Sequence, residues 1–159
     1  TATPISMNIM QGFSIFSTSL VIQLHVVGMF LPSLFTGNLV KKFGHQKLIY
    51  SGILLLFICI VINYSFQTYA GYMIGLILLG VGWNFLFVSG TSLLVLSYKK
   101  EDRFLAQGVN DFVVFSTQSI GSLSAGFLLY LIGWKMLNLV CLPILLLFFL
   151  FSFKNFSKK

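Results

Sequence analysis

Five side chains set within long apolar stretches are the residues of this sequence best suited to chemistry: His25, Trp83, Asn84, Asp111 and Gln118. Asp111 is the only acid inside an apolar stretch, and a histidine such as His25 changes charge near neutral pH. These two residues could therefore carry a proton. The two amides could hold a solute through hydrogen bonds, and the indole ring of Trp83 could add a ring contact.

Each of these side chains also has a structural interpretation that the sequence leaves open. Asp111 could bond to the neighbouring Asn110 or to amides at a helix end, since it lies only about 10 Å along its helix. The histidine and the amides could join neighbouring helices by hydrogen bonds, and the indole could simply fill space.

The composition excludes most classes of soluble protein. The chain has 159 residues, of which 57% are hydrophobic and 8% charged, and its mean hydropathy is +0.96. A soluble domain carries about 25% charged residues. A soluble enzyme, a nucleic-acid-binding domain, a disordered tail and a disulfide-stapled secreted module are therefore all excluded. We expect an integral membrane protein whose immediate surroundings are the lipid bilayer.

The sequence contains no pattern of residues typical of a catalytic, metal or cofactor site. Cys59 and Cys141 stand alone in apolar runs, without a CxxC pair or a neighbouring histidine. There is no nucleophile beside a base and no HExxH motif. We therefore expect neither enzyme activity nor a bound metal or cofactor.

The apolar runs predict an all-α membrane bundle in a single domain, residues 1–159. They are continuous and longer than the strands of a membrane barrel, and a helix needs about 20 apolar residues to cross a bilayer. The five predicted spans are about 14–40, 46–64, 69–97, 104–132 and 136–153. The sequence starts without Met, and residues 1–12 resemble the end of an earlier span. We therefore expect a truncated N-terminus.

The basic residues predict the orientation of the bundle. Of the ten Lys and Arg residues, all but Lys135 fall at three points that five alternating crossings place on one side. These points are Lys41, Lys42 and Lys47; Lys99, Lys100 and Arg103; and Lys154, Lys158 and Lys159. Since such residues are retained in the cytoplasm, we expect that side and the C-terminus to be cytoplasmic.

Polar and small residues distinguish interior from peripheral helices. Spans 46–64 and 136–153 are almost wholly apolar, so they are expected to face lipid, whereas the other three carry polar side chains that need protein or water around them. Small residues at helical spacing predict close helix packing. They are Gly71, Gly75, Gly82, Gly121, Ala125 and Gly126. We expect a solute path between the three polar spans, lined by His25, Asn84, Asp111 and Gln118.

The segment Gly37-Asn-Leu39-Val-Lys41-Lys42-Phe-Gly44-His45-Gln46-Lys47 resembles the cytoplasmic loop signature G-x-L-A-D-R-x-G-R-[KR] of the major facilitator superfamily. Gly37, Leu39, Lys42 and Gly44 match it, and Lys47 falls in its basic tail. The sequence departs from the signature at Lys41, which stands in the place of the acid, and at His45 and Gln46. Further segments, 25–37, 82–85 and 107–112, resemble a prokaryotic branch of the family.

The resemblance covers nearly the whole chain, as the end of helix seven through helix twelve of a twelve-helix transporter. It implies that the eighth, tenth and eleventh helices line a cavity and that the ninth and twelfth are peripheral. It further implies ion- or proton-coupled transport of a small solute by alternating access, in a bacterial inner membrane, with an N-terminal half as partner. The alternative is a non-transporting scaffold or receptor that uses the same bundle.

Overall fold

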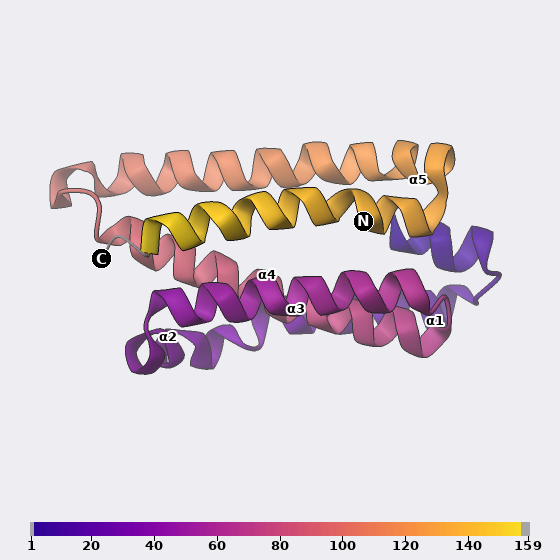
Figure 1. Cartoon of the computed structure of the whole chain (residues 1–159). Coiled ribbons are helices and arrows are strands. Elements are labelled where there is room, and N and C mark those ends of the chain that lie inside the picture. The colour runs from indigo at the N-terminus through magenta and orange to yellow at the C-terminus, as the bar shows by residue number, and fades with distance from the viewer. Residues whose placement is uncertain (1, 157–159) are drawn as a thin grey trace.

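The computed structural model describes residues 2–156, and within that range it is built of helices without strands. The order is η1 (Ile5–Met10), α1 (Ile15–Phe30), α2 (Ser33–Phe43), α3 (His45–Ser65), α4 (Tyr69–Val95), η2 (Lys100–Asp102) and α5 (Arg103–Phe156). Figure 1 shows the long helices running side by side as a bundle. The expected all-α helical bundle is confirmed.

The predicted helix 14–40 is present as two helices that meet at Pro32. Proline lacks the amide hydrogen that would bond to the preceding turn, so a helix is interrupted there. The axes of α1 and α2 are bent by 41° at this point. After the bend, α2 continues to Phe43, so Lys41 and Lys42 lie on the helix rather than in the predicted loop.

A single residue separates α2 from α3. Gly44 has φ +83°, in the left-handed region that glycine enters without a steric penalty. The chain turns there and α3 begins at His45. The connection between the first two predicted spans is therefore much shorter in the structure than the loop predicted from the sequence.

The helix α5 consists of two arms that reverse direction at Gly133. This residue has φ 73° and ψ 173°, which are not helical values. The first arm (residues 103–132) and the second arm (residues 134–156) correspond to the predicted helices 104–132 and 136–153. In Figure 1 the two arms lie side by side, the second turning back along the first.

The tightest packing in the described residues is around α4, which contacts α3 and α1 along their lengths. The second arm of α5 packs against α3. The first arm is mostly exposed, with Phe104, Leu123 and Tyr130 each more than 80% accessible. The span 104–132, predicted to be interior, is therefore the least covered within the described residues, whereas α3, predicted to be peripheral, packs closely.

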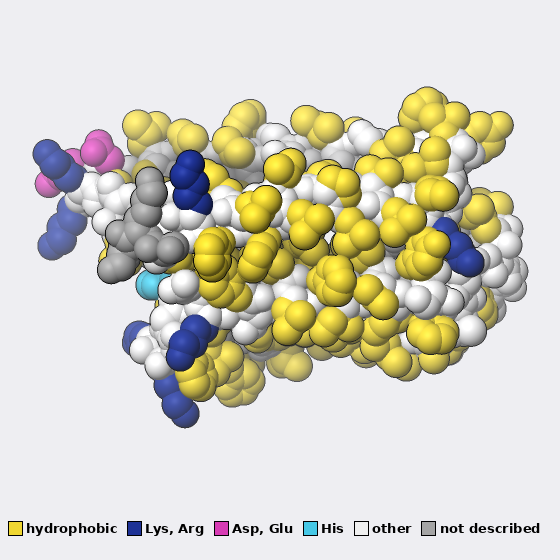
Figure 2. Space-filling view, viewed as in Figure 1, with side chains coloured by type: hydrophobic (Ala, Val, Ile, Leu, Met, Phe, Trp, Pro, Cys, Tyr) yellow, Lys and Arg dark blue, Asp and Glu magenta, His cyan; other side chains and the backbone are white. Residues whose placement is uncertain are grey.

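Length and apolar composition suit this bundle to a membrane. Helices α3 and α4 and the stretch Lys100–Phe156 are each long and apolar enough to cross a bilayer, and the bent pair α1 and α2 would form a fourth such unit. Apolar side chains cover the sides of the bundle, and most described Lys and Arg side chains gather at one end (Figure 2). Lys158 and Lys159 lie outside the described residues. The chain is an integral membrane protein.

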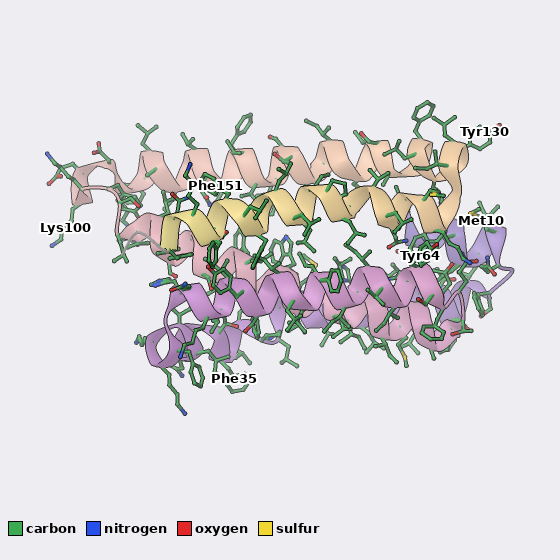
Figure 3. All side chains as sticks on the ribbon, in the orientation of Figure 1. Met10, Phe35, Tyr64, Lys100, Tyr130 and Phe151 are labelled. Carbon is green, nitrogen blue, oxygen red and sulfur yellow. The ribbon has the colours of Figure 1, made fainter. Side chains whose placement is uncertain are left out.

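Lys135, the one basic residue predicted for the opposite side, lies toward the other end of the bundle from the basic cluster. The ammonium nitrogen of Lys135 is 5.8 Å from the ring centre of Tyr64. Figure 3 shows Tyr64 at the far end of the bundle from Lys100. The charge separation along the bundle axis therefore agrees with the alternating order of the predicted spans.

Candidate functional site

A pocket lies where the break between α1 and α2 faces the middle of α4 and the first arm of α5. Its volume is about 530 Å³, within the usual range of small-molecule sites. Its lining residues are Met29, Phe30, Ser33, Trp83, Phe87, Val88, Phe115, Gln118, Ser119 and Ser122. The pocket thus lies between the same three predicted spans as the expected solute path.

Aromatic rings form much of the pocket wall. Trp83 and Phe87 are one turn apart on α4, with ring centres 4.7 Å apart and planes inclined by only 9°. Phe115 of α5 meets Phe87 at 6.4 Å in a tilted arrangement. Two of the five candidate residues, Trp83 and Gln118, line this pocket.

Asn84 does not line the pocket. It forms hydrogen bonds with residues on both sides of the helix break beside the pocket. Its amide nitrogen donates to the Met29 carbonyl at 2.8 Å and to the Ser33 hydroxyl at 2.6 Å, and its oxygen accepts from the Thr36 hydroxyl at 2.7 Å. An uninterrupted helix would pair the Met29 carbonyl with the amide of residue 33. Asn84 thus supplies a donor where the helix is broken, and it is 1% exposed.

His25 is buried at the contact between α1 and α4. Its Nδ1 lies 2.9 Å from the Leu76 carbonyl oxygen. Because a carbonyl can only accept, Nδ1 carries the hydrogen of this bond. The ring is therefore held by an interhelical hydrogen bond and lies apart from the pocket lining.

Asp111 is exposed on the first arm of α5, where Asn110 donates a hydrogen bond of 3.1 Å to its carboxylate. It lines a separate surface hollow that shares Phe115 and Ser119 with the pocket. Of the four residues predicted to line the solute path, Gln118 lines the pocket. Trp83, the other candidate residue, lines it as well. His25, Asn84 and Asp111 lie around it.

Comparison with known proteins identifies the scaffold. The family model of the Major Facilitator Superfamily matches residues 1–158 of the chain. The chain belongs to the major facilitator superfamily.

Curated relatives of the chain are bacterial proteins named as transporters. The chain is 38% identical over 92% of its length to the riboflavin transporter RfnT of Brucella anthropi. It is 32% identical over 94% of its length to YddS and 33% identical over 88% to YdeG, two uncharacterised transporters of the same superfamily in Bacillus subtilis. It spans 37%, 36% and 33% of these three proteins. No solved structure matches the chain.

The segment that resembles the superfamily's loop signature is mostly helical. Gly37, Leu39 and Lys42 lie on α2, Gly44 forms the turn, and Lys47 lies in the first turn of α3. The ammonium group of Lys42 is 5.2 Å from the Phe43 ring centre. The positive φ at Gly44 gives a physical reason for glycine at that position of the signature.

Three of the predicted packing residues, Gly71, Gly75 and Gly82, are buried where α4 faces α3 and the turn before it. A side chain at Gly82 would meet Leu56 at 3.0 Å. On the first arm of α5, by contrast, a side chain at Gly121 would have no atom within 4 Å, and Ala125 and Gly126 are only partly buried. Ala125 nevertheless packs against the buried cluster that contains Met7 and Leu129, and a side chain at Gly126 would meet Ile5 at 3.8 Å.

The close approach of the α1 and α4 backbones was not predicted from the sequence. A Cβ atom at Gly80 would lie 2.5 Å from the His25 carbonyl oxygen, and one at Gly28 would lie 3.1 Å from the Ile77 carbonyl oxygen. Phe87 and Phe115 were also not predicted as pocket residues. The four-residue spacing of Trp83 and Phe87 was the available signal, since residues four apart share a helix face.

Proposed function

We propose that the protein containing this chain moves a small solute across a membrane by alternating access, and that the pocket between α1, α4 and α5 forms part of its path. The observation that carries the proposal is the position of this pocket, beside a helix break and between helices of two differently packed regions. Solute sites of transporters commonly lie near the midplane, where helices are interrupted. Trp83 is close to the middle of α4.

A vitamin-like solute is the first candidate. The relative named as a riboflavin transporter supports testing riboflavin before other compounds. The pocket supports a small organic solute because its wall is apolar and aromatic, with few polar groups.

We further propose that the basic end of the bundle and the C-terminus are cytoplasmic, in a bacterial inner membrane. The gathering of basic side chains at one end supports this orientation (Figure 2). The first arm of α5 is proposed to face the second bundle of the full-length protein. The large apolar area that this arm exposes, and the greater length of the relatives, support that partner.

The test is uptake by the natural full-length protein reconstituted in liposomes, with riboflavin and a broad panel of other solutes. We expect accumulation of at least one solute against its gradient, and none in liposomes without protein. A protein that moves no solute, together with normal growth of cells carrying His25→Ala and Asp111→Asn, would favour a scaffold or receptor instead.

Proton coupling is proposed to involve Asp111, whose hollow adjoins the pocket through Phe115 and Ser119. We expect Asp111→Asn to reduce proton-driven uptake about tenfold or more, since proton transfer by a placed side chain contributes roughly 10²-fold or more where it is rate-limiting. Solute exchange, which needs no net proton movement, should be reduced less. Equal loss in both modes would point to a structural role.

His25 can be tested by a substitution that keeps its hydrogen bond. In His25→Asn the amide nitrogen takes the position of Nδ1 and can still donate to the Leu76 carbonyl, but it does not titrate. If His25 carries a proton, this variant should lose driven uptake and keep exchange. If both modes are retained, the interhelical bond is its whole contribution.

A further inference from the structure

The pocket wall contains a flat ring surface suited to one class of solute. Trp83 and Phe87 are stacked nearly parallel, and Phe115 closes on Phe87 from α5. Within residues 2–156, Phe87 is the only ring that pairs with Trp83. The other face of the indole has no ring partner among these residues, and Trp83 lines the pocket, so a flat solute in the pocket is placed to contact the ring pair. Such stacking favours planar conjugated molecules, since every aromatic ring has a π-face.

The polar groups of the pocket are few and complementary. The Ser33 hydroxyl accepts from Asn84, which leaves its own hydrogen to donate. The Ser119 hydroxyl donates to the Phe115 carbonyl at 2.8 Å, which leaves it able to accept. The amide of Gln118 can do both. This set suits the edge of a ring that contains C=O and N–H groups.

The charge and number of polar groups on this wall of the pocket favour a flat ring system over ions and sugars. Among the described residues, no charged side chain lines the pocket. An ion would lose its hydration there without gaining a partner of opposite charge. A sugar would need more hydrogen bonds than these few groups supply. The volume of about 530 Å³ is sufficient for a molecule of two or three fused rings.

We propose that this pocket selects an uncharged, fused-ring heterocycle that stacks on Trp83 and is oriented by hydrogen bonds donated by Ser33, accepted by Ser119, and donated or accepted by Gln118. The proposal rests on the proposed transport function, because it names the solute class of the same site. Trp83 is the specificity-determining residue, since it provides the ring surface.

The test is equilibrium binding to the full-length protein in lipid nanodiscs. The probe is lumichrome, an uncharged flat three-ring heterocycle, followed by its own fluorescence. Proflavine, a three-ring cation, tests the charge requirement, and ribitol, a non-planar polyol, tests the ring requirement as a competitor. The variants are Trp83→Leu, which removes the ring, and Trp83→Phe, which retains a smaller one. Phe151→Leu is the matched control, because Phe151 is exposed on the second arm of α5, outside the pocket lining.

We expect saturable lumichrome binding whose Kd rises about tenfold or more in Trp83→Leu and about threefold in Trp83→Phe, with no change in Phe151→Leu. Proflavine should bind at least about tenfold more weakly than lumichrome, and ribitol should not compete. An unchanged Kd in Trp83→Leu, equal binding of proflavine, or absence of lumichrome binding would overturn the proposal. Recovery of binding in Trp83→Phe excludes general misfolding as the cause of the loss.

Transport measured in parallel separates this proposal from the proposed function. If the protein accumulates a polyol or an ion and lumichrome neither binds nor competes, the solute class is wrong and transport stands. If lumichrome binds with the expected variant pattern but no solute is moved, the pocket assignment stands and the transport function fails.

Discussion

Two regions of this chain have similar apolar compositions but pack very differently. In the first region, α1 to α4, backbones approach closely at Gly28, Gly80 and Gly52. In the second, the first arm of α5, a side chain added at Gly108 or Gly121 would meet nothing within 4 Å. The buried interhelical hydrogen bonds of α1 and α2 also go to α4 rather than to α5.

The difference shows that apolar character alone does not hold helices together in a membrane. Lipid is as apolar as a leucine side chain, so helices associate where small residues allow close contact and where polar groups find partners. The pocket lies between the two regions, with Trp83 on the closely packed side and Gln118 on the exposed arm. A solute held there would contact both regions.

The strongest test of this comparison is to add a methyl group at the contact between α1 and α4. Gly80→Ala should destabilise the full-length protein by about 1 to 3 kcal/mol, because the new Cβ would lie 2.5 Å from a backbone oxygen that cannot move aside easily. Gly90→Ala on the same helix is the control, since it has nothing within 4 Å. It should be neutral or stabilising by up to about 1 kcal/mol. Thermal unfolding in detergent measures both, and equal effects would contradict the contact.

A smaller effect is expected at the helix break. Asn84→Leu keeps the branched shape of the side chain, with slightly larger end groups, but removes three hydrogen bonds, and it should cost about 1 to 2 kcal/mol. In Thr91→Val, the control, the lost bonds are to carbonyls of α4 itself, so no interhelical contact is broken. Denaturant titration of the two purified variants compares them. Asn84→Leu with the stability of the unmodified protein would show that the break holds without this residue.

The smallest effect is expected at the contact between η1 and α4. Tyr72→Phe removes one hydroxyl, which is 2.7 Å from the Ser6 hydroxyl, and keeps the ring contact with Trp134 at 5.1 Å. One such bond in a membrane protein is worth about 0.6 kcal/mol. Tyr130→Phe, on the exposed arm, should change nothing. A double variant with Ser6→Ala checks the pair, because its effect should not exceed that of Tyr72→Phe if the bond is the cause.

Much of the fold could be predicted because its signals are local. Pro32 lies at the bend of 41°, as expected for a residue that lacks the amide hydrogen needed by a continuous helix. The apolar runs predicted the ends of each long helix to within a few residues. The exception is the first predicted helix, which is two helices in the structure. The prediction of a loop of several residues before α3 was wrong. A single glycine can turn the chain when its φ is positive, and the sequence does not show φ.

The site was harder to predict, because helical periodicity does not show which neighbour a helix face meets. Periodicity placed Asn84 with other polar residues on α4 but could not show that its partners, Met29 and Thr36, lie at a break some fifty positions away. His25 was likewise recognised as polar within an apolar stretch, while its partner, the Leu76 carbonyl, is a backbone group that no sequence pattern marks.

Composition and charge were sufficient to place this chain in a membrane with its basic residues at one end. The reason is that ions and unpaired polar groups cost too much free energy in hydrocarbon to be placed freely. Only the tertiary structure decided which polar residues line the pocket and which join helices. That choice depends on how each helix is rotated against its neighbours, and contacts between residues far apart in sequence, such as those at Gly80 and Asn84, set this rotation.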